Sequence, residues 1–171
     1  MPSATPENLH CLVEIPKGSR NKYEWDPELQ QIKLDRFLFS SVVYPTDYGF
    51  IPQTLAQDGD PLDAMVVVSE PTFPGCMIPV KAIALFRMTD DKGQDDKVLC
   101  VPRQDPNWNE LETLEDLPHQ LRDEISHFFS IYKQPEGKEV TVQGWMSREE
   151  AFAEIDDAHR RWAELPDGVA R

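Results

Sequence analysis

The sequence predicts a mainly β protein of the α+β class, in which a small barrel or curled sheet is packed by helices. The first two thirds of the chain have the pattern of short strands separated by turn signals, whereas the final third changes to helical spacing. Many strands followed by late helices are typical of this class. At 171 residues, with 40% hydrophobic and 28% charged residues, the chain has the size and composition of one ordinary domain.

Six segments of the first two thirds are predicted to be strands. They cover residues 10–15, 22–26, 31–35, 62–69, 78–88 and 97–101. The turn signal Asp26-Pro27-Glu28 joins the second and third of these strands into a hairpin. The polar, glycine-bearing segment 89–96 connects the last two strands in the same manner.

The final third is predicted to contain two helices with a short strand between them. Apolar and aromatic residues recur at helical spacing at Leu121, Ile125, Phe128, Phe129 and Tyr132. A short strand is expected at residues 140–145. Ser147 and Glu150 form a capping box, so the second helix is expected to begin at about Arg148.

The net charge of the chain is −14, and this value disfavours two classes of partner. Nucleic acids and anionic membranes both bind through clustered Lys and Arg, which this composition lacks. The longest apolar run, residues 64–68, is far too short to span a bilayer, and residues 1–6 have neither a basic region nor an apolar signal core. We therefore expect a cytoplasmic protein with no nucleic-acid or membrane partner.

The most informative stretch is Asp58-Gly59-Asp60-Pro61-Leu62-Asp63, which is followed at once by the apolar run 64–68. Carboxylates at the mouth of a buried strand are costly unless a cation lies between them. Oxygen ligands without a nearby His or Cys favour a hard ion such as Mg²⁺, Mn²⁺ or Ca²⁺ over zinc. A solvated acidic turn is the alternative, and the hexapeptide by itself leaves both interpretations open.

A second acidic segment bears on this choice. Asp90 and Asp95 lie in the connection of a different predicted hairpin. If the barrel brings the two segments together, five carboxylates converge on one place. Without a metal ion, such convergence would raise the pKa values of several carboxyl groups and destabilise the fold. The two segments together therefore favour a metal site.

The acidic hexapeptide belongs to an ordered series of motifs. The others are Glu14-Ile15-Pro16, Asn21-Lys22-Tyr23-Glu24, Leu34-Asp35-Arg36, Tyr44-Pro45-Thr46-Asp47-Tyr48-Gly49-Phe50, the segment 90–97, and His127-Phe128-Phe129-Ser130-Ile131-Tyr132-Lys133. The series resembles the soluble family I inorganic pyrophosphatases, with a bacterial and particularly actinobacterial character in residues 16–24. Because the resemblance extends over nearly the whole chain, it implies a single inorganic pyrophosphatase domain at residues 1–171. The fold that it implies is a five-stranded, OB-like closed barrel with flanking helices, two of them C-terminal.

The resemblance implies hydrolysis of inorganic pyrophosphate to two orthophosphates. Several Mg²⁺ ions are implied in each site, with Mn²⁺ as a possible substitute. Because pyrophosphate is a polyanion, carboxylates would repel it unless they were loaded with such ions. A water shared by two of the ions would have a pKa low enough to supply hydroxide near neutral pH. The assembly implied is a homo-oligomer, specifically a hexamer.

Site residues are carried over from the resemblance position by position. Asp60 resembles the catalytic residue that takes the proton from the attacking water. The metal ligands match Asp58, Asp63, Asp90, Asp95 and Glu24. The substrate-binding side chains match Lys22, Arg36, Tyr48, Lys97, Tyr132 and Lys133. Glu14 matches an acid that lines the site without a defined role, and Asp96 is an additional acid that competes as a ligand or tunes metal affinity. On the residues alone, Tyr132 would be a core residue of its helix, and Arg36 and Lys22 would be surface residues of strands.

Two other classes of protein stay open at this point. The first is an OB-type module that binds single-stranded nucleic acid through aromatic residues and a basic groove, which the charge of −14 opposes. The second is a calcium-binding or metal-storage domain that uses the same acidic segments without turnover. Phosphate release from pyrophosphate, measured with and without Mg²⁺, separates these classes from the enzyme.

Overall fold

Five strands form a closed ring in the computed structural model, which describes residues 4–166. In order around the ring they are β1 (Leu9–Ile15), β4 (Asp47–Phe50), β5 (Asp63–Val66), β8 (Lys97–Pro102) and β6 (Met77–Asp90). The ring closes because β6 pairs back with β1. Neighbours in the ring are antiparallel except β5 and β8, which are parallel.

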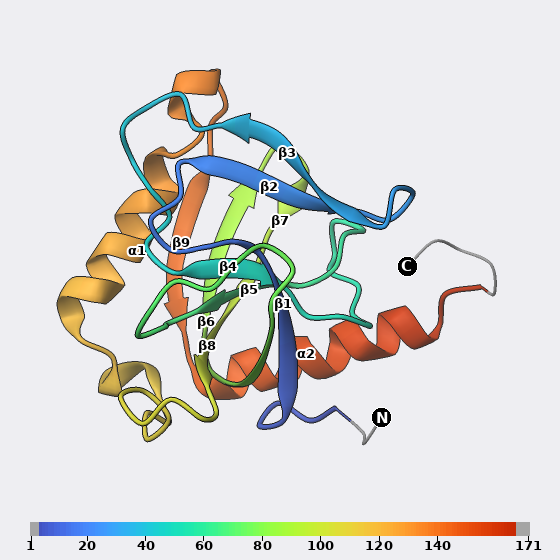
Figure 1. The fold of residues 1–171 in the computed structure, drawn as a ribbon. Coiled ribbons are helices and arrows are strands. Elements are labelled where there is room, and N and C mark those ends of the chain that lie inside the picture. The colour runs from blue at the N-terminus through green and yellow to red at the C-terminus, as the bar shows by residue number, and fades with distance from the viewer. Residues whose placement is uncertain (1–3, 167–171) are drawn as a thin grey trace.

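The remaining elements surround this ring (Figure 1). The strands β2 (Asn21–Asp26) and β3 (Gln31–Phe37) form a separate two-stranded sheet, whereas β7 (Gly93–Gln94) and β9 (Thr141–Met146) both pair with β6. Helix α1 (His119–Ile131) and helix α2 (Arg148–Ala163) lie on different sides of the strands. Two short 3₁₀ helices, η1 (Leu114–Asp116) and η2 (Gln134–Glu136), precede and follow α1.

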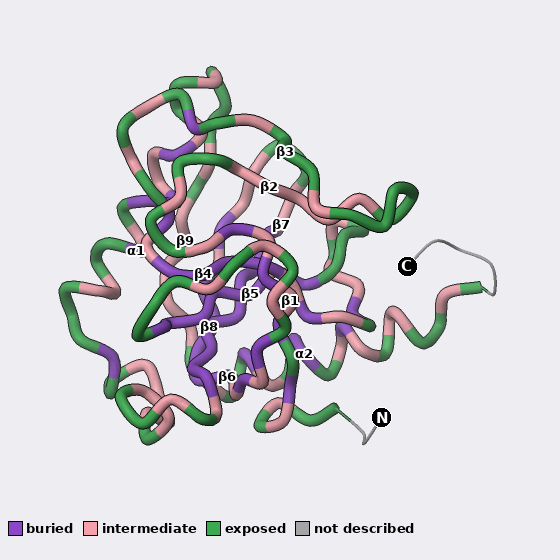
Figure 2. Tube along the Cα trace, viewed as in Figure 1, coloured by how far each residue is buried: buried purple, intermediate pink, exposed green. Residues whose placement is uncertain are grey.

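The core consists of two apolar clusters on the two faces of the strands. One cluster contains Ala64 of β5 together with Ile155 of α2. The other contains Met65 of β5 together with Phe129 of α1. Because successive strand residues point to opposite faces, β5 and β8 are buried on both sides, which explains their near-continuous apolar sequence. Figure 2 shows the buried residues concentrated in the ring, with the β2–β3 hairpin largely outside it.

The predicted mainly β, α+β fold with two C-terminal helices is confirmed, and five strands close on themselves as the OB-like barrel requires. The capping box is confirmed in part: the Ser147 side chain accepts the backbone N–H of Glu150 at 3.2 Å, and α2 begins at Arg148. Among the described residues, no helix combines the length and the apolarity that a membrane crossing needs. The expectation about the start of the chain involves residues 1–3, which lie outside the described residues.

Two details of the predicted strands were wrong. β4 was not predicted at all, because four residues are too few to show a strand period. The predicted strand 62–69 is shortened to Asp63–Val66. Val67 still donates its N–H to the Cys100 carbonyl at 3.1 Å, and Val67 and Val68 are buried beyond the end of the strand. The predicted hairpin 22–26/31–35 is confirmed, and its two strands form a sheet of their own beside the ring.

Gly49 in β4 gives a first testable prediction. A β-carbon at this position would lie 1.8 Å from the carbonyl oxygen of Leu12 in β1, so Gly49→Ala forces the two strands apart. We expect a loss of at least about 3 kcal/mol in the free energy of unfolding, measured by urea denaturation. The control is Gly137→Ala, where φ is +72° and no atom lies within 4 Å of the added carbon; only about 1–2 kcal/mol of backbone strain is expected there. Equal losses in the two variants would contradict the close approach of β1 and β4.

Candidate active site

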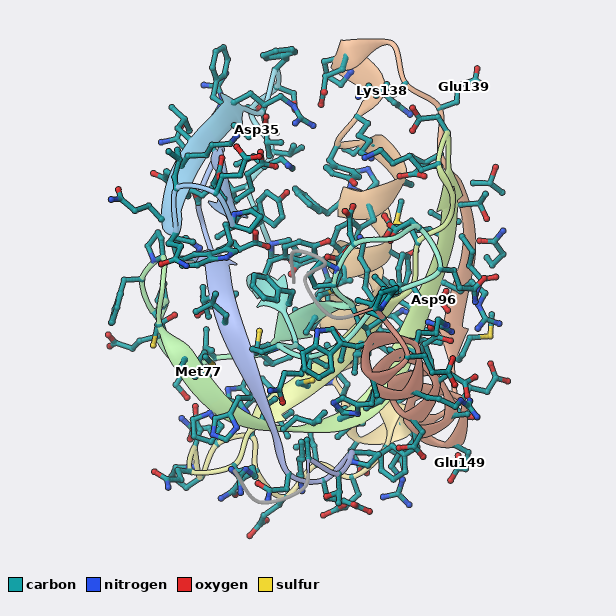
Figure 3. All side chains as sticks on the ribbon, turned by 90° about the vertical axis from the view of Figure 1, so that its right-hand side faces the viewer. Asp35, Met77, Asp96, Lys138, Glu139 and Glu149 are labelled. Carbon is teal, nitrogen blue, oxygen red and sulfur yellow. The ribbon has the colours of Figure 1, made fainter. Side chains whose placement is uncertain are left out.

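A cavity of about 910 Å³ lies between the ring, the β2–β3 hairpin and the end of α2. Its lining contains all thirteen side chains that the sequence analysis carried over: Glu14, Lys22, Glu24, Arg36, Tyr48, Asp58, Asp60, Asp63, Asp90, Asp95, Lys97, Tyr132 and Lys133. Asp35 of the hairpin and Lys138, which follows η2, also line it and come from different parts of the fold (Figure 3). The fold therefore brings together residues that lie more than a hundred positions apart in the chain.

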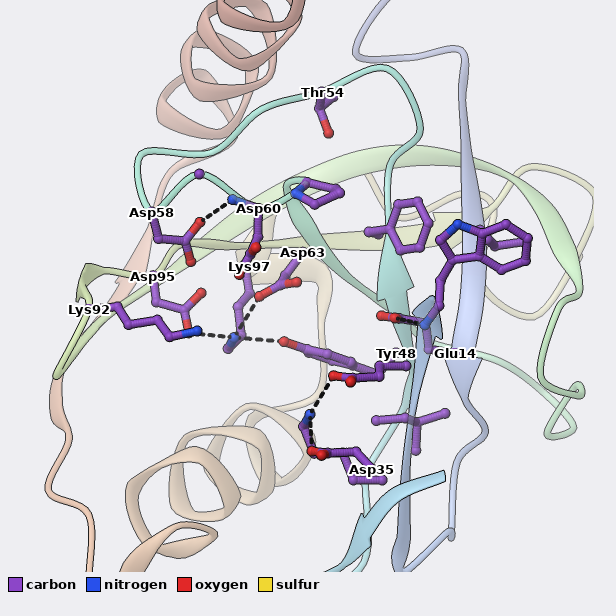
Figure 4. A pocket seen from close by; sticks show the side chains of 18 of the residues that line it. Glu14, Asp35, Tyr48, Thr54, Asp58, Asp60, Asp63, Lys92, Asp95 and Lys97 are labelled. Carbon is purple, nitrogen blue, oxygen red and sulfur yellow. Dashed lines mark hydrogen bonds and ion pairs between the residues drawn. The ribbon is translucent and has the colours of Figure 1, made fainter. Parts of the chain in front are cut away.

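Lys97 is the central cation of the cavity. It is the first residue of β8 and is only 1% exposed. Its Nζ donates to the Tyr48 hydroxyl at 2.7 Å and to one carboxylate oxygen each of Asp63 and Asp95 at 3.1 Å (Figure 4). The parallel register of β5 and β8 places Asp63 opposite Lys97, so strand pairing itself sets this contact. Burial alone would lower the pKa of Lys97, but the two carboxylates outweigh it and hold the pKa well above its usual value.

The carboxyl groups around Lys97 outnumber the charge that it can neutralise. Burial raises the pKa of Asp63 to about 7, although Lys97 acts in the opposite direction. Burial also raises the pKa of Asp58. For Asp95, burial is outweighed by Lys97, which holds the pKa below its usual range. The predicted consequence of convergence without metal, raised carboxyl pKa values, is therefore found at Asp58 and Asp63.

These residues fit a hard divalent ion. The donors available are carboxylate oxygens, which is the donor set that Mg²⁺ and Mn²⁺ prefer. Asp58 and Asp63 are partly buried, and carboxyl groups whose pKa is raised by burial are stabilised in their ionised form by an additional cation nearby. Within residues 4–166, no three His, Cys, Asp or Glu side chains are arranged closely enough to hold an ion as they stand. Instead, the ammonium of Lys97 lies between Asp63 and Asp95.

The acidic loop before β5 has its own internal bonds. At its base, Ile51 donates its N–H to the Leu62 carbonyl at 3.0 Å, and the Thr54 hydroxyl accepts the N–H of Leu62 at 2.9 Å. Closer to the tip, the N–H of Asp60 donates to the Asp58 carboxylate at 3.0 Å. The loop is thus tied together at both ends, which keeps these two carboxylates at the edge of the cavity (Figure 4).

The hairpin supplies two cations from adjacent strands. Lys22 of β2 and Arg36 of β3 are paired in the strand register, and both contact the Asp35 carboxylate, Lys22 at 2.9 Å. Arg36 is held on its other side by Glu136 of η2, with Nε 2.8 Å from Oε1 and Nη2 3.1 Å from Oε2. Each of the two cations therefore already has a carboxylate partner at the cavity.

The end of α1 contributes a second cationic group. Lys133 donates from Nζ to Asp90 at 3.2 Å, and its Nζ lies 5.4 Å from the centre of the Tyr132 ring. Tyr132 is buried and stacks on Phe128 with ring centres 5.3 Å apart. The interpretation of Tyr132 as a core residue thus describes its packing correctly, while the same residue also lines the cavity.

The two glutamates of the predicted site lie beside the hairpin. Glu14 of β1 accepts the backbone N–H of Trp25 at 2.8 Å, and burial raises its pKa to about 7. Glu24 of β2 has oxygens 3.8 Å from Lys22 Nζ and 3.6 Å from Lys33 Nζ.

Several contacts at the cavity were not predicted. Asp35 and Glu136 are the partners of Arg36, and Lys92, Lys138 and the end of α2 add further lining. Asp35 belongs to the motif Leu34-Asp35-Arg36, so the sequence did contain a signal for it. Glu136 had no such signal, because its contact depends on tertiary placement.

Asp96 does not compete with the carboxylates of the cavity as a ligand. It is absent from the residues that line the cavity, and its carboxylate is held by Arg87 at 3.0 and 3.2 Å and by Gln94 at 2.8 Å. The adjacent Asp95 has a different partner, since its carboxylate accepts from Lys97 at 3.1 Å.

A closed ring of strands whose cavity combines acidic, cationic and tyrosine side chains has the features of an enzyme that binds a phosphate anion through metal ions. The family model described as inorganic pyrophosphatase matches residues 11–163. The inorganic pyrophosphatase of Methanosarcina mazei is 56% identical over 161 residues, which are 94% of this chain and 95% of the relative. That of Streptomyces coelicolor is 55% identical over 151 residues, 88% of this chain and 93% of the relative.

Solved structures agree with these relatives. The crystal structure of inorganic pyrophosphatase from Thermus thermophilus matches with a TM-score of 0.91 and 43% identity, covering 94% of each chain. An inorganic pyrophosphatase from Coxiella burnetii matches with a TM-score of 0.90 and 39% identity, covering 95% of this chain and 99% of the other. The chain belongs to the soluble family I inorganic pyrophosphatases, and it is an enzyme. The resemblance recognised from the motifs is therefore confirmed.

The contacts of Lys97 give a second testable prediction. Lys97→Met leaves Asp63 and Asp95 facing each other without the ammonium, so in EDTA the free energy of unfolding should fall by about 3–5 kcal/mol. Mg²⁺ should recover part of this loss, because a cation again lies between the carboxylates. The control is Lys81→Met, whose partner Glu112 is exposed, with an expected loss within about 1 kcal/mol. Similar losses in both variants, measured by urea denaturation, would contradict this interpretation of the charge balance.

Glu14 gives a prediction about pH. Its carboxyl has a pKa of about 7 in the folded protein and 4.5 as the ordinary value, so the folded state binds the extra proton. Its contribution to stability is therefore complete at low pH and is lost as the pH rises through 7, by at most about 3 kcal/mol. Glu14→Gln keeps an acceptor for Trp25 but does not titrate. In EDTA, the difference in unfolding free energy between wild type and variant should change between pH 4.5 and 8. Parallel stability curves for the two proteins would show that this assignment is wrong.

Proposed function

We propose that this chain hydrolyses inorganic pyrophosphate to two orthophosphates, with several Mg²⁺ ions in the cavity and Mn²⁺ as a substitute. The observation that carries the proposal is that all thirteen side chains expected from the family resemblance line one cavity. The chain's membership of the pyrophosphatase family supports the same substrate.

The carboxylates of the two acidic loops are the proposed metal ligands. Asp58 and Asp63 from the first loop, Asp90 and Asp95 from the second, and Glu24 from the hairpin would hold the ions. When bound, Mg²⁺ would offset the charge of pyrophosphate and lower the pKa of a coordinated water. These carboxyl groups must be ionised to bind, so metal affinity should weaken as the pH falls below 7.

Asp60 is the proposed proton acceptor for the attacking water. Its backbone is held from both sides, since its N–H donates to Asp58 at 3.0 Å and its carbonyl accepts the N–H of Ala56 at 2.7 Å. These backbone bonds of the loop hold Asp60 at the cavity. A general base held in this way takes the proton as the nucleophile attacks the phosphorus.

The cations and tyrosines are the proposed phosphate ligands. Arg36 presents a planar guanidinium suited to two oxygens of one phosphate, whereas Lys22 and Lys133 act as point charges. Lys97 is fixed by three contacts, which makes it a positive charge of constant position. Tyr48 and Tyr132 would offer hydroxyl groups to phosphate oxygens.

The assembly and location follow the same resemblance. We propose a homohexamer in the cytoplasm without nucleic-acid or membrane partners, in agreement with the net charge of −14. Sedimentation of the purified chain measures the assembly directly.

Asp60→Asn tests the proposed function. The two side chains have nearly the same size, and the bonds that hold residue 60 come from its backbone, so the melting temperature should stay close to that of the wild type. Release of phosphate from pyrophosphate with Mg²⁺ should fall by about 100-fold or more, because the general base is lost. The matched control is Asp123→Asn, an exposed aspartate on α1 outside the cavity, which should retain full activity.

Near-normal turnover in Asp60→Asn would contradict the assignment of Asp60 as the proton acceptor. A folded wild type that releases no phosphate with Mg²⁺ would contradict the proposed function itself and favour the metal-storage alternative. Addition of excess EDTA to active wild type should abolish phosphate release, and Mg²⁺ should restore it.

A further inference from the structure

Helix α2 carries a partly buried ion pair that lies outside the lining of the cavity. Arg161 contacts the carboxylate of Glu154 through Nη1 at 3.2 Å and through Nη2 at 3.1 Å. Glu154 is only 7% exposed, although it sits on a helix that faces solvent on its other side. Burying a carboxylate is costly even when it is paired, and an apolar residue of similar volume would avoid this cost, so Glu154 calls for another explanation.

Arg161 reaches from α2 to the acidic loop. Its Nη1 donates to the backbone carbonyl of Leu55 at 2.8 Å. The N–H of the same Leu55 donates to the carbonyl of Ala158 in α2 at 3.0 Å. Both backbone groups of Leu55 are therefore bonded to the helix, three residues before Asp58. Arg161 is the side chain that completes this attachment.

The attachment continues into the loop through backbone bonds. Ala56, which follows Leu55, donates its N–H to the carbonyl of Asp60 at 2.7 Å, and its own carbonyl accepts the N–H of Gly59 at 3.2 Å. A shift of Leu55 would therefore be transmitted to Asp58 and Asp60 through a short, hydrogen-bonded turn. The position of these carboxylates depends on where α2 holds Leu55.

Glu154 also lies against the second acidic segment. Ala56 and Gln57 from the first loop and Gln94 and Asp96 from the second share a small recess with Glu154. Asp96 is 5% exposed and directly follows Asp95, a proposed metal ligand, and Figure 3 shows it beside α2. The charge of Asp96 adds to the effect of burial in raising the pKa of Glu154, whereas Arg161 opposes them. The ion pair of α2 is thus bonded to Leu55, just before the first acidic segment, and shares a recess with Gln94 and Asp96 of the second.

We infer that Arg161 and Glu154 are positioning residues, which hold the acidic loop so that Asp58 and Asp60 face the cavity and thereby set the affinity for divalent metal. Glu154 orients the guanidinium, and the guanidinium supplies the directional bond to Leu55. The inference rests on the proposed function for its consequence on turnover. Its consequence on metal binding does not depend on turnover.

The test compares neighbouring arginines of α2 by calorimetric titration of the full chain with Mg²⁺. In Arg161→Met the carbonyl of Leu55 loses its side-chain donor, and the dissociation constant for Mg²⁺ should rise by about 10-fold or more, as is typical when a residue that supports a ligand is removed. The matched control is Arg160→Met. Arg160 is 62% exposed and pairs with Asp157 on the surface of the helix, so its loss should leave the Mg²⁺ affinity unchanged.

Two further variants separate positioning from general stability. Arg161→Lys keeps the charge but offers no fork of donors, and Glu154→Gln removes the charge that orients the guanidinium. Both should bind Mg²⁺ with intermediate affinity while their circular dichroism spectra match the wild type. If Arg161→Met fails to fold, these two variants decide the inference.

Wild-type affinity in the folded Arg161 and Glu154 variants, or an equal loss in Arg160→Met, would overturn the inference. The proposed function fails separately, if the wild type binds Mg²⁺ but releases no phosphate from pyrophosphate. In that case the comparison of the Arg161 and Arg160 variants still decides whether the ion pair sets metal affinity.

Discussion

The buried contact of Lys97 with Asp63 and Asp95 is the interaction on which the rest of the site depends. A fully buried ammonium is untenable without carboxylates, and two facing carboxylates are untenable without a cation. The parallel pairing of β5 and β8 brings Asp63 next to Lys97. Asp95 reaches Lys97 from the segment between β7 and β8. The pairing of ring strands and the balance of charge therefore depend on each other, because β5 begins at Asp63 and β8 begins at Lys97.

Each of the cations proposed to bind phosphate has a carboxylate partner, and these pairs determine how the cavity would accept an anion. Around its rim, Lys22 contacts Asp35, Lys133 contacts Asp90, and Arg36 contacts Glu136. A polyanion would have to displace these carboxylates from their cationic partners. Under the proposed function, Mg²⁺ bound to Asp90 would leave Lys133 to contact phosphate. Asp35 and Glu136 are not proposed metal ligands, so phosphate itself would compete with them for Lys22 and Arg36. Burial raises the pKa values of Asp58 and Asp63 although Lys97 lowers them, so an additional cation would favour the ionised form of both groups.

The sequence predicted the parts of this molecule that depend on local patterns or on motifs. The long strand β6, the apolar strand β8 and the capped start of α2 each have a strong local signal. β4 has only four residues, and its place in the ring depends on the close approach of Gly49 to β1, which no local pattern contains. The thirteen residues proposed for the site were predicted from motif resemblance, and the fold gathers them in one cavity. The contact of Glu136 with Arg36 joins positions a hundred residues apart, so it required the tertiary structure.

The last helix shows why a site built on loops needs support from outside the ring. The acidic loop has few backbone bonds to neighbouring strands, and loops of this kind are more mobile than the elements they connect. Apolar packing of α2 on the strands fixes the helix, and the helix in turn fixes Leu55 through Arg161 and the carbonyl of Ala158. Metal ligands must keep their relative positions closely. A loop that supplies such ligands therefore needs a rigid support, and α2 is the element that supplies it here. The cost of burying Glu154 is then explained by the direction that it gives to Arg161, which an apolar pair would not provide.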